Sequence, residues 1–392
     1  MITGCTTAVG TLVPAGFLVR SFILKRVVDP VRCDLQKGNL MVGRIPRGVS
    51  AAVDDATRAA SIHNSQPWIF VFNGDSIHLW LDVGRAPHVV DPSGRWALES
   101  AGAASANLEL ALAHRLGTRV TVTPFPDVRP DPPKTLVPIS RDQVPQILRD
   151  LSRAPVATVS WQGGQQELDP PEEALYGAIE HRYTSRAPFA STPMTARQWR
   201  DITAAGAVGT VSTEQVPEDF ARSFVKLTAE VEARLVDDVA YLAEIKRWVD
   251  RGPREGIPSG ATGVRDSSGQ YPGRDFSVGP DLWGSSLPEG EFEGRLQLAA
   301  IFSDQDTPAD WFDAGRALER VGLRATSSGL RIGILGQAIE EEATQRAVSQ
   351  EYSSALGRPV VVQQVVRLGY GDGSPRPAAT PRRRLDEVLV RG

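Results

Sequence analysis

Apolar and polar positions recur along the chain with the periods of both helices and strands. Residues 68–81 contain two aromatic and β-branched runs on either side of Asn73-Gly74, the strongest short turn signal, which predicts a β-hairpin. Residues 96–116 have the spacing of small and apolar residues of a long helix, and Gly117 ends it. The same criteria predict further helices over 50–60, 172–182, 218–250 and 310–328, and strands over 120–124, 296–302 and 359–368.

Two long regions lack such a pattern. Residues 1–48 show no clear period, and the uncharged stretch 2–19 is followed by basic residues, whereas a secretory signal is preceded by them. We therefore expect an N-terminal extension without a membrane span. Residues 251–290 contain nine Gly and five Pro, which predicts a long surface loop that makes few core contacts.

A faint internal similarity links two of the predicted helices. The segment A-G-A-A-S-A-N-L-E-L-A-L-A-H-R-L-G begins at Ala101, and the segment A-G-R-A-L-E-R-V-G-L-R-A-T-S-S-G-L begins at Ala314. Four of the seventeen aligned positions are identical, and small residues are frequent in both segments. The similarity by itself therefore does not establish a duplication.

The composition is that of an ordinary globular protein with two domains or one large double-lobed unit. Its 392 residues are 41% hydrophobic and 23% charged. The net charge of −4 disfavours a nucleic-acid partner. The chain has only two cysteines, and its five histidines are scattered, which argues against a disulfide framework and a Cys/His metal site. We expect a reducing, cytoplasmic compartment.

The common nucleophile and phosphate motifs are missing from the sequence. It contains neither the G-x-x-x-x-G-K-[ST] phosphate loop nor the G-x-S-x-G nucleophile elbow. The glycine-rich run 369–373 is followed by Ser-Pro-Arg-Pro instead of a helix, so it predicts a turn. Hydrolase and transferase functions therefore lack a recognisable nucleophile.

Three polar segments remain as candidate chemistry. Residues 61–68, S-I-H-N-S-Q-P-W, fit a loop that offers N–H groups to an anion or a ring edge, or a turn anchored by a Trp. Residues 182–189, R-Y-T-S-R-A-P-F, place two guanidinium groups four residues apart, which suits a phosphate as well as a solvated turn. Residues 381–385, P-R-R-R-L, fit a solvated tail or an ordered basic element, because an ordered pattern resumes behind them.

In combination, these segments resemble the nitroreductase superfamily of FMN-dependent oxidoreductases. The run S-x-x-N-S-Q-P-W is similar to the family's N-x-Q-P-W loop, R-Y-T-S-R-x-x-F to its R-x-S-x-R-x-F phosphate motif, and P-R-R-R-L to its C-terminal P-K-x-R element. The segments D-P-S-G-R, D-T-P-A-D-W and R-L-G-Y-G are similar to the Acg-like branch, in which two nitroreductase-like lobes share one chain. The resemblance covers residues 48–392.

The resemblance implies an α+β fold, a fused pseudo-dimer in which each lobe packs helices on a mixed, mostly antiparallel sheet. Residues 48–168 would form the first lobe and 169–392 the second, which carries the insertion 251–290, while 1–47 would be an extension. Each flavin motif occurs once, so a single chain would form one complete FMN site from both lobes. The implied cofactor contacts are Ser61, Asn64 and Gln66 from the first lobe, and Arg182, Thr184, Arg186, Gly336, Arg382 and Arg384 from the second.

The activity that the resemblance implies is an NAD(P)H-dependent flavin oxidoreductase acting on a small-molecule electron acceptor. The flavin would carry the hydride chemistry, so we expect no catalytic side chain, no metal, and no nucleic-acid or membrane partner. Two alternatives stay open: an FMN-sequestering storage protein, whose flavin the loop 251–290 covers, and a flavin-free interaction protein. The sequence departs from the family pattern at Ala60, where the family has a proline, and at Ile62, where it has a serine.

Overall fold

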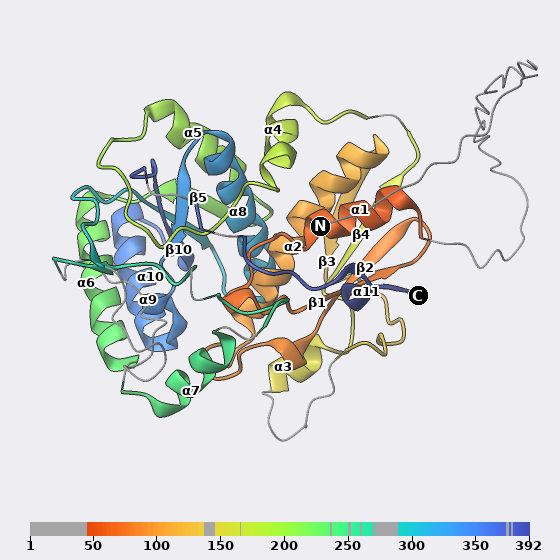
Figure 1. Ribbon diagram of the computed structural model, residues 1–392, viewed down its shortest axis with the longest axis horizontal. Coiled ribbons are helices and arrows are strands. Elements are labelled where there is room, and N and C mark those ends of the chain that lie inside the picture. The colour runs from red at the N-terminus through yellow and green to blue at the C-terminus, as the bar shows by residue number, and fades with distance from the viewer. Residues whose placement is uncertain are drawn as a thin grey trace, which may run out of the picture. The chain divides into compact units, whose positions relative to one another are not determined.

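Two β-sheets and two long helices organise the described part of the chain (Figure 1). Helix α2 (Arg95–Leu116) packs against the first sheet, helix α8 (Pro308–Ser327) packs against the second, and the two helices pack against each other. This is the predicted α+β fold with mixed, mostly antiparallel sheets. The computed structural model describes residues 45–392 except 137–145, 165, 236, 250–251, 259–260, 269–270, 272–288, 374–375 and 378.

The first sheet contains four strands from the first half of the chain and the last strand. It is built of β1 (Trp68–Phe72), β2 (Ser76–Leu81), β3 (Arg119–Pro124), β4 (Ala157–Gln162) and β11 (Leu389–Arg391), in the order β11-β1-β2-β4-β3. Strands β1 and β2 form the predicted hairpin, in which Gly74 has the left-handed φ of 73° that the turn requires. Strand β11 runs parallel to β1, so the C-terminus completes this sheet.

The second sheet is antiparallel throughout and comes from the second half of the chain. It is built of β5 (Val211–Gln215), β8 (Leu298–Ser303), β9 (Arg331–Ile334) and β10 (Val361–Gly369), in the order β5-β8-β10-β9. The central strands β8 and β10 are almost completely buried, which explains the apolar runs that predicted them. A separate pair joins β6 (Arg265–Asp266) to β7 (Glu289–Gly290).

Helices α2 and α8 approach each other closely at two glycines. A Cβ atom on Gly102 would lie 2.0 Å from the carbonyl oxygen of Phe312, and one on Gly315 would lie 1.9 Å from the carbonyl oxygen of Glu99. The contact is reciprocal. Gly102 lies three residues after Glu99, whose carbonyl faces Gly315, and Gly315 lies three residues after Phe312, whose carbonyl faces Gly102. Gly102 and Gly315 also occupy equivalent positions in the two similar segments, so the faint sequence similarity coincides with a symmetric contact.

The remaining helices surround this centre. The predicted helix 218–250 is two helices, because Asp238 accepts hydrogen bonds from the N–H groups of Ala240 and Tyr241 and so caps a new helix. The sequence predictions missed α5 and α10. The bounds are α1 (Arg47–Ala56), η1 (Ile62–Asn64), η2 (Val83–Arg85), α3 (Gln146–Leu151), α4 (Pro170–Ala178), α5 (Ala196–Ala205), α6 (Glu218–Leu235), α7 (Val239–Trp248), α9 (Gln337–Glu340), α10 (Glu342–Leu356) and α11 (Leu385–Val388).

The insertion 251–290 makes more core contacts than the sequence predicts. Its described part includes Ile257, Ala261 and Tyr271, which are at most 9% exposed and belong to hydrophobic clusters. The prediction of few core contacts was wrong because a high Gly and Pro content disfavours helices and strands, while the apolar residues between them still become buried.

Contacts join the described residues from both sheets into one unit, 45–392. The lobe boundary after residue 168 therefore stays a prediction. In the described part of the chain, no helix has the length and apolar character needed to cross a membrane. The uncharged stretch 2–19 lies outside the described residues.

Candidate functional site

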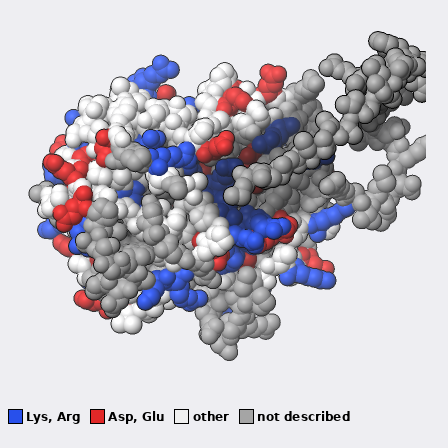
Figure 2. Space-filling model, viewed as in Figure 1, with Lys and Arg blue, Asp and Glu red and all other residues white. Residues whose placement is uncertain are grey.

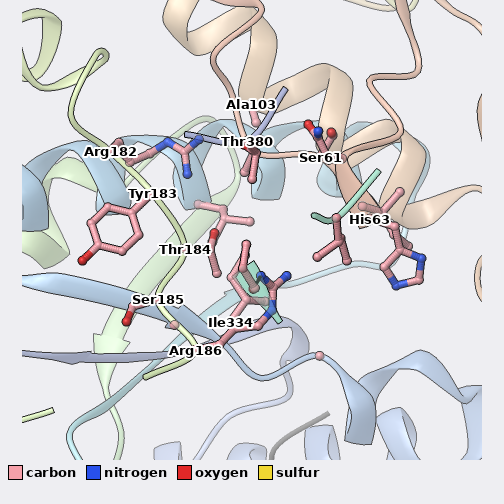
Figure 3. A pocket seen from close by; sticks show the side chains of 18 of the residues that line it. Ser61, His63, Ala103, Arg182, Tyr183, Thr184, Ser185, Arg186, Ile334 and Thr380 are labelled. Atoms are coloured by element: carbon pink, nitrogen blue, oxygen red, sulfur yellow. Dashed lines mark hydrogen bonds between the residues drawn. The ribbon is translucent and has the colours of Figure 1, made fainter. Parts of the chain in front are cut away.

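A cavity of about 280 Å³ lies where segments from both halves of the chain meet. The loop that follows α1 and one face of α2 form part of its wall, and the segment 179–186, the β9–α9 connection and residues near the C-terminus form the rest. In Figure 3, Ser61 and Ala103 surround the same space as Arg182, Thr184 and Ile334.

Seven of the nine cofactor residues expected from the sequence line this cavity, although they come from four separate segments. Gln66 and Arg384 are not among its lining residues. The seven that the fold brings together are Ser61, Asn64, Arg182, Thr184, Arg186, Gly336 and Arg382.

The loop 61–66 holds an unusual backbone conformation. His63, Asn64 and Gln66 have positive φ angles of 46°, 53° and 51°, in the left-handed region that residues other than glycine rarely adopt. The Ser61 carbonyl accepts a bond from the Asn64 N–H at 3.0 Å, and its hydroxyl accepts one from the Gln66 N–H at 3.2 Å. Such strain persists only where surrounding contacts enforce it, and it is concentrated at binding sites.

Gln66 does not line the cavity, and its side chain instead holds the conformation of this loop through hydrogen bonds. Its side chain is fully buried; Nε2 donates to the carbonyl of Arg254 at 2.8 Å, and Oε1 accepts from the N–H of Arg383 at 2.8 Å. Gln66 therefore joins the loop to the insertion and to the C-terminal segment. This placement supports a positioning role, and the direct cofactor contact that the resemblance implies for Gln66 stays a prediction.

The segment after α4 runs beside β9, and this places its polar side chains. Thr184 forms a parallel bridge with Ile332, whose carbonyl accepts a bond from the Ser185 N–H at 2.7 Å. Arg186 reaches the insertion, where its Nη1 donates to the carbonyl of Ala261 at 2.9 Å. The motif R-Y-T-S-R is thus an ordered, extended segment and not a solvated turn.

Basic side chains gather near the middle of the face shown in Figure 2, and six arginines line the cavity. Arg182 and Arg382 both donate to the carbonyl of Arg58, at 2.7 and 3.1 Å. Glu319 is buried and pairs with Arg182 at 2.8 Å. The six lining arginines are Arg58, Arg182, Arg186, Arg367, Arg376 and Arg382.

The positive charge of this cluster exceeds the negative charge that the described residues supply. Neither Arg58 nor Arg382 has a carboxylate within ion-pair distance among the described residues, and the buried Nε of Arg382 has no hydrogen-bond acceptor there. Desolvation and the adjacent charge of Arg182 lower the pKa of Arg382 to about 9, against the opposing effect of Glu319. The cluster is therefore suited to an anion.

Arg384, which the resemblance placed beside the phosphate, does not line this cavity. Its side chain is 61% exposed and pairs with Asp386 at 2.6 Å. The adjacent Arg383 is buried, and its Nη1 donates to the carbonyl of Gln66 at 3.0 Å. Because consecutive side chains of P-R-R-R-L point in different directions, only Arg382 reaches the cavity.

The sequence reasoning missed Glu319, which also accounts for the departure at Ala60. The Glu319 carboxylate accepts bonds from the Ala60 N–H at 3.0 Å and from Asn107 Nδ2 at 3.1 Å. A proline at position 60 would have no N–H to donate. The available signal was an acid among the small and apolar residues of the middle of the helix, Ala317, Leu318 and Val321.

A second acid that the sequence reasoning missed, Glu99, lines the other part of the cavity wall. It lies one helical turn after Trp96, whose ring lies 3.8 Å from the place of a Cβ on Gly336. Glu99 is 3% exposed, and its Oε2 accepts a bond from Gln364 Nε2 at 2.6 Å. Burial raises the pKa of Glu99 to about 8, although Gln364 and Arg95 oppose the shift.

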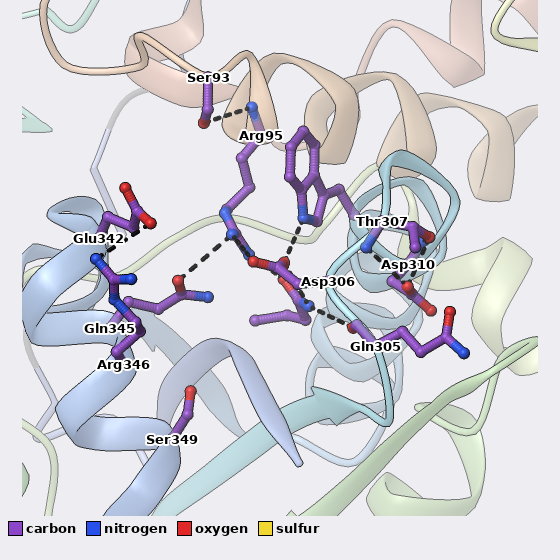
Figure 4. A network of polar contacts seen from close by, with 12 residues as sticks. Ser93, Arg95, Gln305, Asp306, Thr307, Asp310, Glu342, Gln345, Arg346 and Ser349 are labelled. Carbon is purple, nitrogen blue, oxygen red and sulfur yellow. Dashed lines mark hydrogen bonds and ion pairs between the residues drawn. The ribbon is translucent and has the colours of Figure 1, made fainter.

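A polar network surrounds Arg95 at the start of α2 (Figure 4). Arg95 donates to Asp306 Oδ2 at 2.8 Å and also contacts Gln363. Trp311 Nε1 donates to Asp306 Oδ1 at 2.6 Å. Because Asp306 precedes α8, the network ties the beginnings of both long helices together.

The pKa of Glu99 leads to a prediction for stability. The folded-state pKa of about 8 exceeds the ordinary value of 4.5, so the neutral acid stabilises the fold below about pH 4.5 and this contribution is lost as the pH rises toward 8. Glu99→Gln should reduce the pH dependence of the free energy of unfolding by up to about 1.4 kcal/mol per pH unit in this window. Urea unfolding at several pH values measures it. Identical slopes for both proteins would contradict the shift.

Comparison with known proteins identifies the family. No protein-family model matches the chain. Two Mycobacterium tuberculosis proteins that carry the name NAD(P)H nitroreductase are similar to it: acg, 30% identical over 87% of this chain and 95% of its own, and Rv3131, 31% identical over 85% and 88%.

Solved nitroreductase structures are similar over about half of the chain. The FMN-bound nitroreductase from Bacteroides fragilis is 18% identical over 53% of this chain and 94% of its own, with a TM-score of 0.32. The NfnB nitroreductase from Mycobacterium smegmatis, in complex with NADPH, is 15% identical over 55% and 96%, also with a TM-score of 0.32. On the identity and coverage of the two Mycobacterium tuberculosis relatives, this chain belongs to the Acg-like branch of the nitroreductase family.

Proposed function

We propose that the chain is an FMN-dependent oxidoreductase that passes hydride from NAD(P)H to a small-molecule acceptor, and that the cavity holds one FMN. The observation that carries this proposal is the arginine cluster. Arg58 and Arg382 bring two guanidinium groups without a carboxylate partner among the described residues, and an FMN phosphate is close to dianionic at neutral pH. An anion of that charge would neutralise the cluster and give the Arg382 Nε its missing acceptor.

The remaining lining residues fit the other parts of FMN. Thr184 and Asn64 add a hydroxyl and an amide to the lining that the arginines, Trp96 and Gly336 share. That apolar wall suits a flat ring, and the absence of a Cβ on Gly336 leaves room for close approach. When bound, the isoalloxazine supplies the hydride chemistry, while the chain binds it, orients it and excludes water.

The reciprocal crossing of α2 and α8 supports one flavin site per chain. Phe312 on α8 is equivalent to Glu99 on α2, because each lies three residues before the glycine at which the two helices cross. Phe312 is fully buried in a hydrophobic cluster, and Phe125 packs edge-on against it. Aromatic side chains therefore fill the place on α8 where an equivalent second cavity would need its wall.

Purified protein is expected to be yellow and to release one FMN per chain on heating. NADPH or NADH should bleach the bound flavin within seconds under anaerobic conditions, as measured by stopped-flow absorbance. Two equivalents of flavin would contradict the single site, and a colourless protein that does not bind added FMN would overturn the proposal.

The same experiment tests the storage alternative, which one observation favours. Ile257, Ala261, Val264 and Tyr271 from the insertion form part of the cavity wall, so this segment covers some of the site. A storage protein would keep its flavin oxidised for minutes in the presence of excess NADPH, whereas a reductase would not.

A further inference from the structure

Glu99 is the one buried acid among the described carboxylates that line the cavity. Glu180 is exposed and Glu340 is half-buried, whereas Glu99 is 3% exposed. Its Oε2 is occupied by Gln364, and its buried Oε1 has no hydrogen-bond partner among the described residues. An ionised carboxylate in this position would leave a charged oxygen both buried and unpaired, which is strongly unfavourable.

Helix packing does not require an acid at this position. The same place relative to the crossing glycines holds Phe312 on α8, and this apolar side chain packs well. An apolar residue at position 99 would avoid the cost of burying a carboxyl group. The acid is therefore better explained by the cavity that it borders than by the helix crossing.

Titratable groups lie on the elements around Glu99, and Asp91, Arg95 and Asp306 act on its charge. Asp91 and Arg95 lie before and at the start of its own helix, Asp306 precedes α8, and Glu340 and Arg367 line the cavity from α9 and β10. The charge of Arg95 is shared with Asp306, to which it is bonded, and Arg367 pairs with Glu293 at 2.8 Å. No cation among the described residues is therefore dedicated to Glu99, and burial raises its pKa to about 8.

We propose that Glu99 is a neutral carboxylic acid that gives its proton to the electron acceptor in the cavity. This inference rests on the proposed function and assigns a residue to the second half of the reaction, in which the acceptor is reduced. Because Gln364 Nε2 donates to Oε2, the proton resides on Oε1. Gln364 thus has a positioning role, since it fixes which oxygen carries the acidic hydrogen.

The proposed step balances for a quinone acceptor. The reduced nicotinamide loses two electrons as hydride, which reaches the quinone through the flavin and leaves a negative charge on the quinone oxygen. The O–H bond of Glu99 breaks and a new O–H bond forms on that oxygen, giving the neutral hydroquinone. The Glu99 carboxylate regains a proton from water. Hydride transfer from the nicotinamide to the flavin requires no proton from the chain, so only the second half depends on Glu99.

The test uses full-length protein loaded with FMN, in the wild-type form and as Glu99→Gln. NADPH should reduce both at the same rate, whereas reoxidation of the variant by menadione should be about 100- to 10,000-fold slower, the usual effect of losing a general acid. Reoxidation by ferricyanide, which accepts electrons without a proton, should be equal for both. The FMN dissociation constant should also be equal, and the infrared difference spectrum of wild type minus variant should contain the band of one protonated carboxyl group at neutral pH.

Asp313→Asn is the matched control, because Asp313 is a buried acid on α8 that does not line the cavity. It should reoxidise with menadione like the wild type. If Glu99→Gln fails to fold, the wild type alone still gives the answer: its menadione rate, and not its NADPH rate, should fall as the pH passes about 8. Equal menadione rates for wild type and Glu99→Gln, or a rate independent of pH, would overturn the role of Glu99 while leaving the reductase proposal intact. Failure of NADPH to bleach the flavin would instead overturn the proposed function.

Discussion

Gly102→Ala is expected to destabilise the chain by more than about 3 kcal/mol, because the new methyl group would meet backbone and not a movable side chain. Its Cβ would lie 2.0 Å from the carbonyl oxygen of Phe312 and 3.1 Å from the N of Arg316. Helices α2 and α8 would have to separate by more than an ångström, which would loosen the packing of both sheets on them. Gly315→Ala should have a similar effect, since its Cβ would lie 1.9 Å from the Glu99 carbonyl oxygen.

The matched control is Gly177→Ala in helix α4, where no atom lies within 4 Å of the added Cβ. This substitution should stabilise the chain by roughly 0.5–1 kcal/mol, because alanine loses less conformational entropy than glycine in a helix. Urea unfolding followed by circular dichroism compares the three variants. If Gly102→Ala and Gly315→Ala were as stable as Gly177→Ala, the close helix crossing would be disproved.

Secondary structure was predictable where local chemistry decides it. The hairpin at Asn73-Gly74 and the end of α2 at Gly117 follow from the left-handed conformation that glycine adopts easily, and the structure confirms both. Strand β4 was missed although its apolar and polar residues alternate along A-T-V-S-W-Q, the pattern of a half-buried strand. Helix α5 was missed although Thr195 and Gln198 form a capping box, a signal that was present in the sequence.

Only those site residues that belong to a recognisable motif could be predicted from the sequence. The family resemblance implied that the arginines would gather, but it did not distinguish Arg382 from Arg384, because the direction of each side chain depends on the backbone of the segment 381–385. Gln66 belongs to the motif, yet its contacts lie behind the loop. Glu99 and Glu319 lie within long helices and belong to no motif, and only the packing of those helices shows that both reach the site.

Arg382→Ala should weaken FMN binding by about 10- to 150-fold while leaving riboflavin binding nearly unchanged. A hydrogen bond to a charged group contributes about 1.5–3 kcal/mol, and about 1.4 kcal/mol corresponds to a tenfold change in affinity. Riboflavin lacks the phosphate, so it measures any effect of the substitution on the ring site or on the fold. Fluorescence titration of the apoprotein with both ligands gives the two dissociation constants.

Arg384→Ala is the matched control, because Arg384 lies two residues after Arg382 and does not line the cavity. The exposed Arg384 pairs with Asp386, so its removal should change neither affinity by more than about twofold, in line with the small contribution of surface ion pairs. Equal losses of FMN and riboflavin in Arg382→Ala would mean that Arg382 supports the fold. A selective loss of FMN in Arg384→Ala would place the phosphate outside the cavity. Arg58, Arg182 and Arg382 hold more positive charge than Glu319 can balance. A selective loss of FMN in Arg382→Ala alone would show that the phosphate of the cofactor completes this cluster.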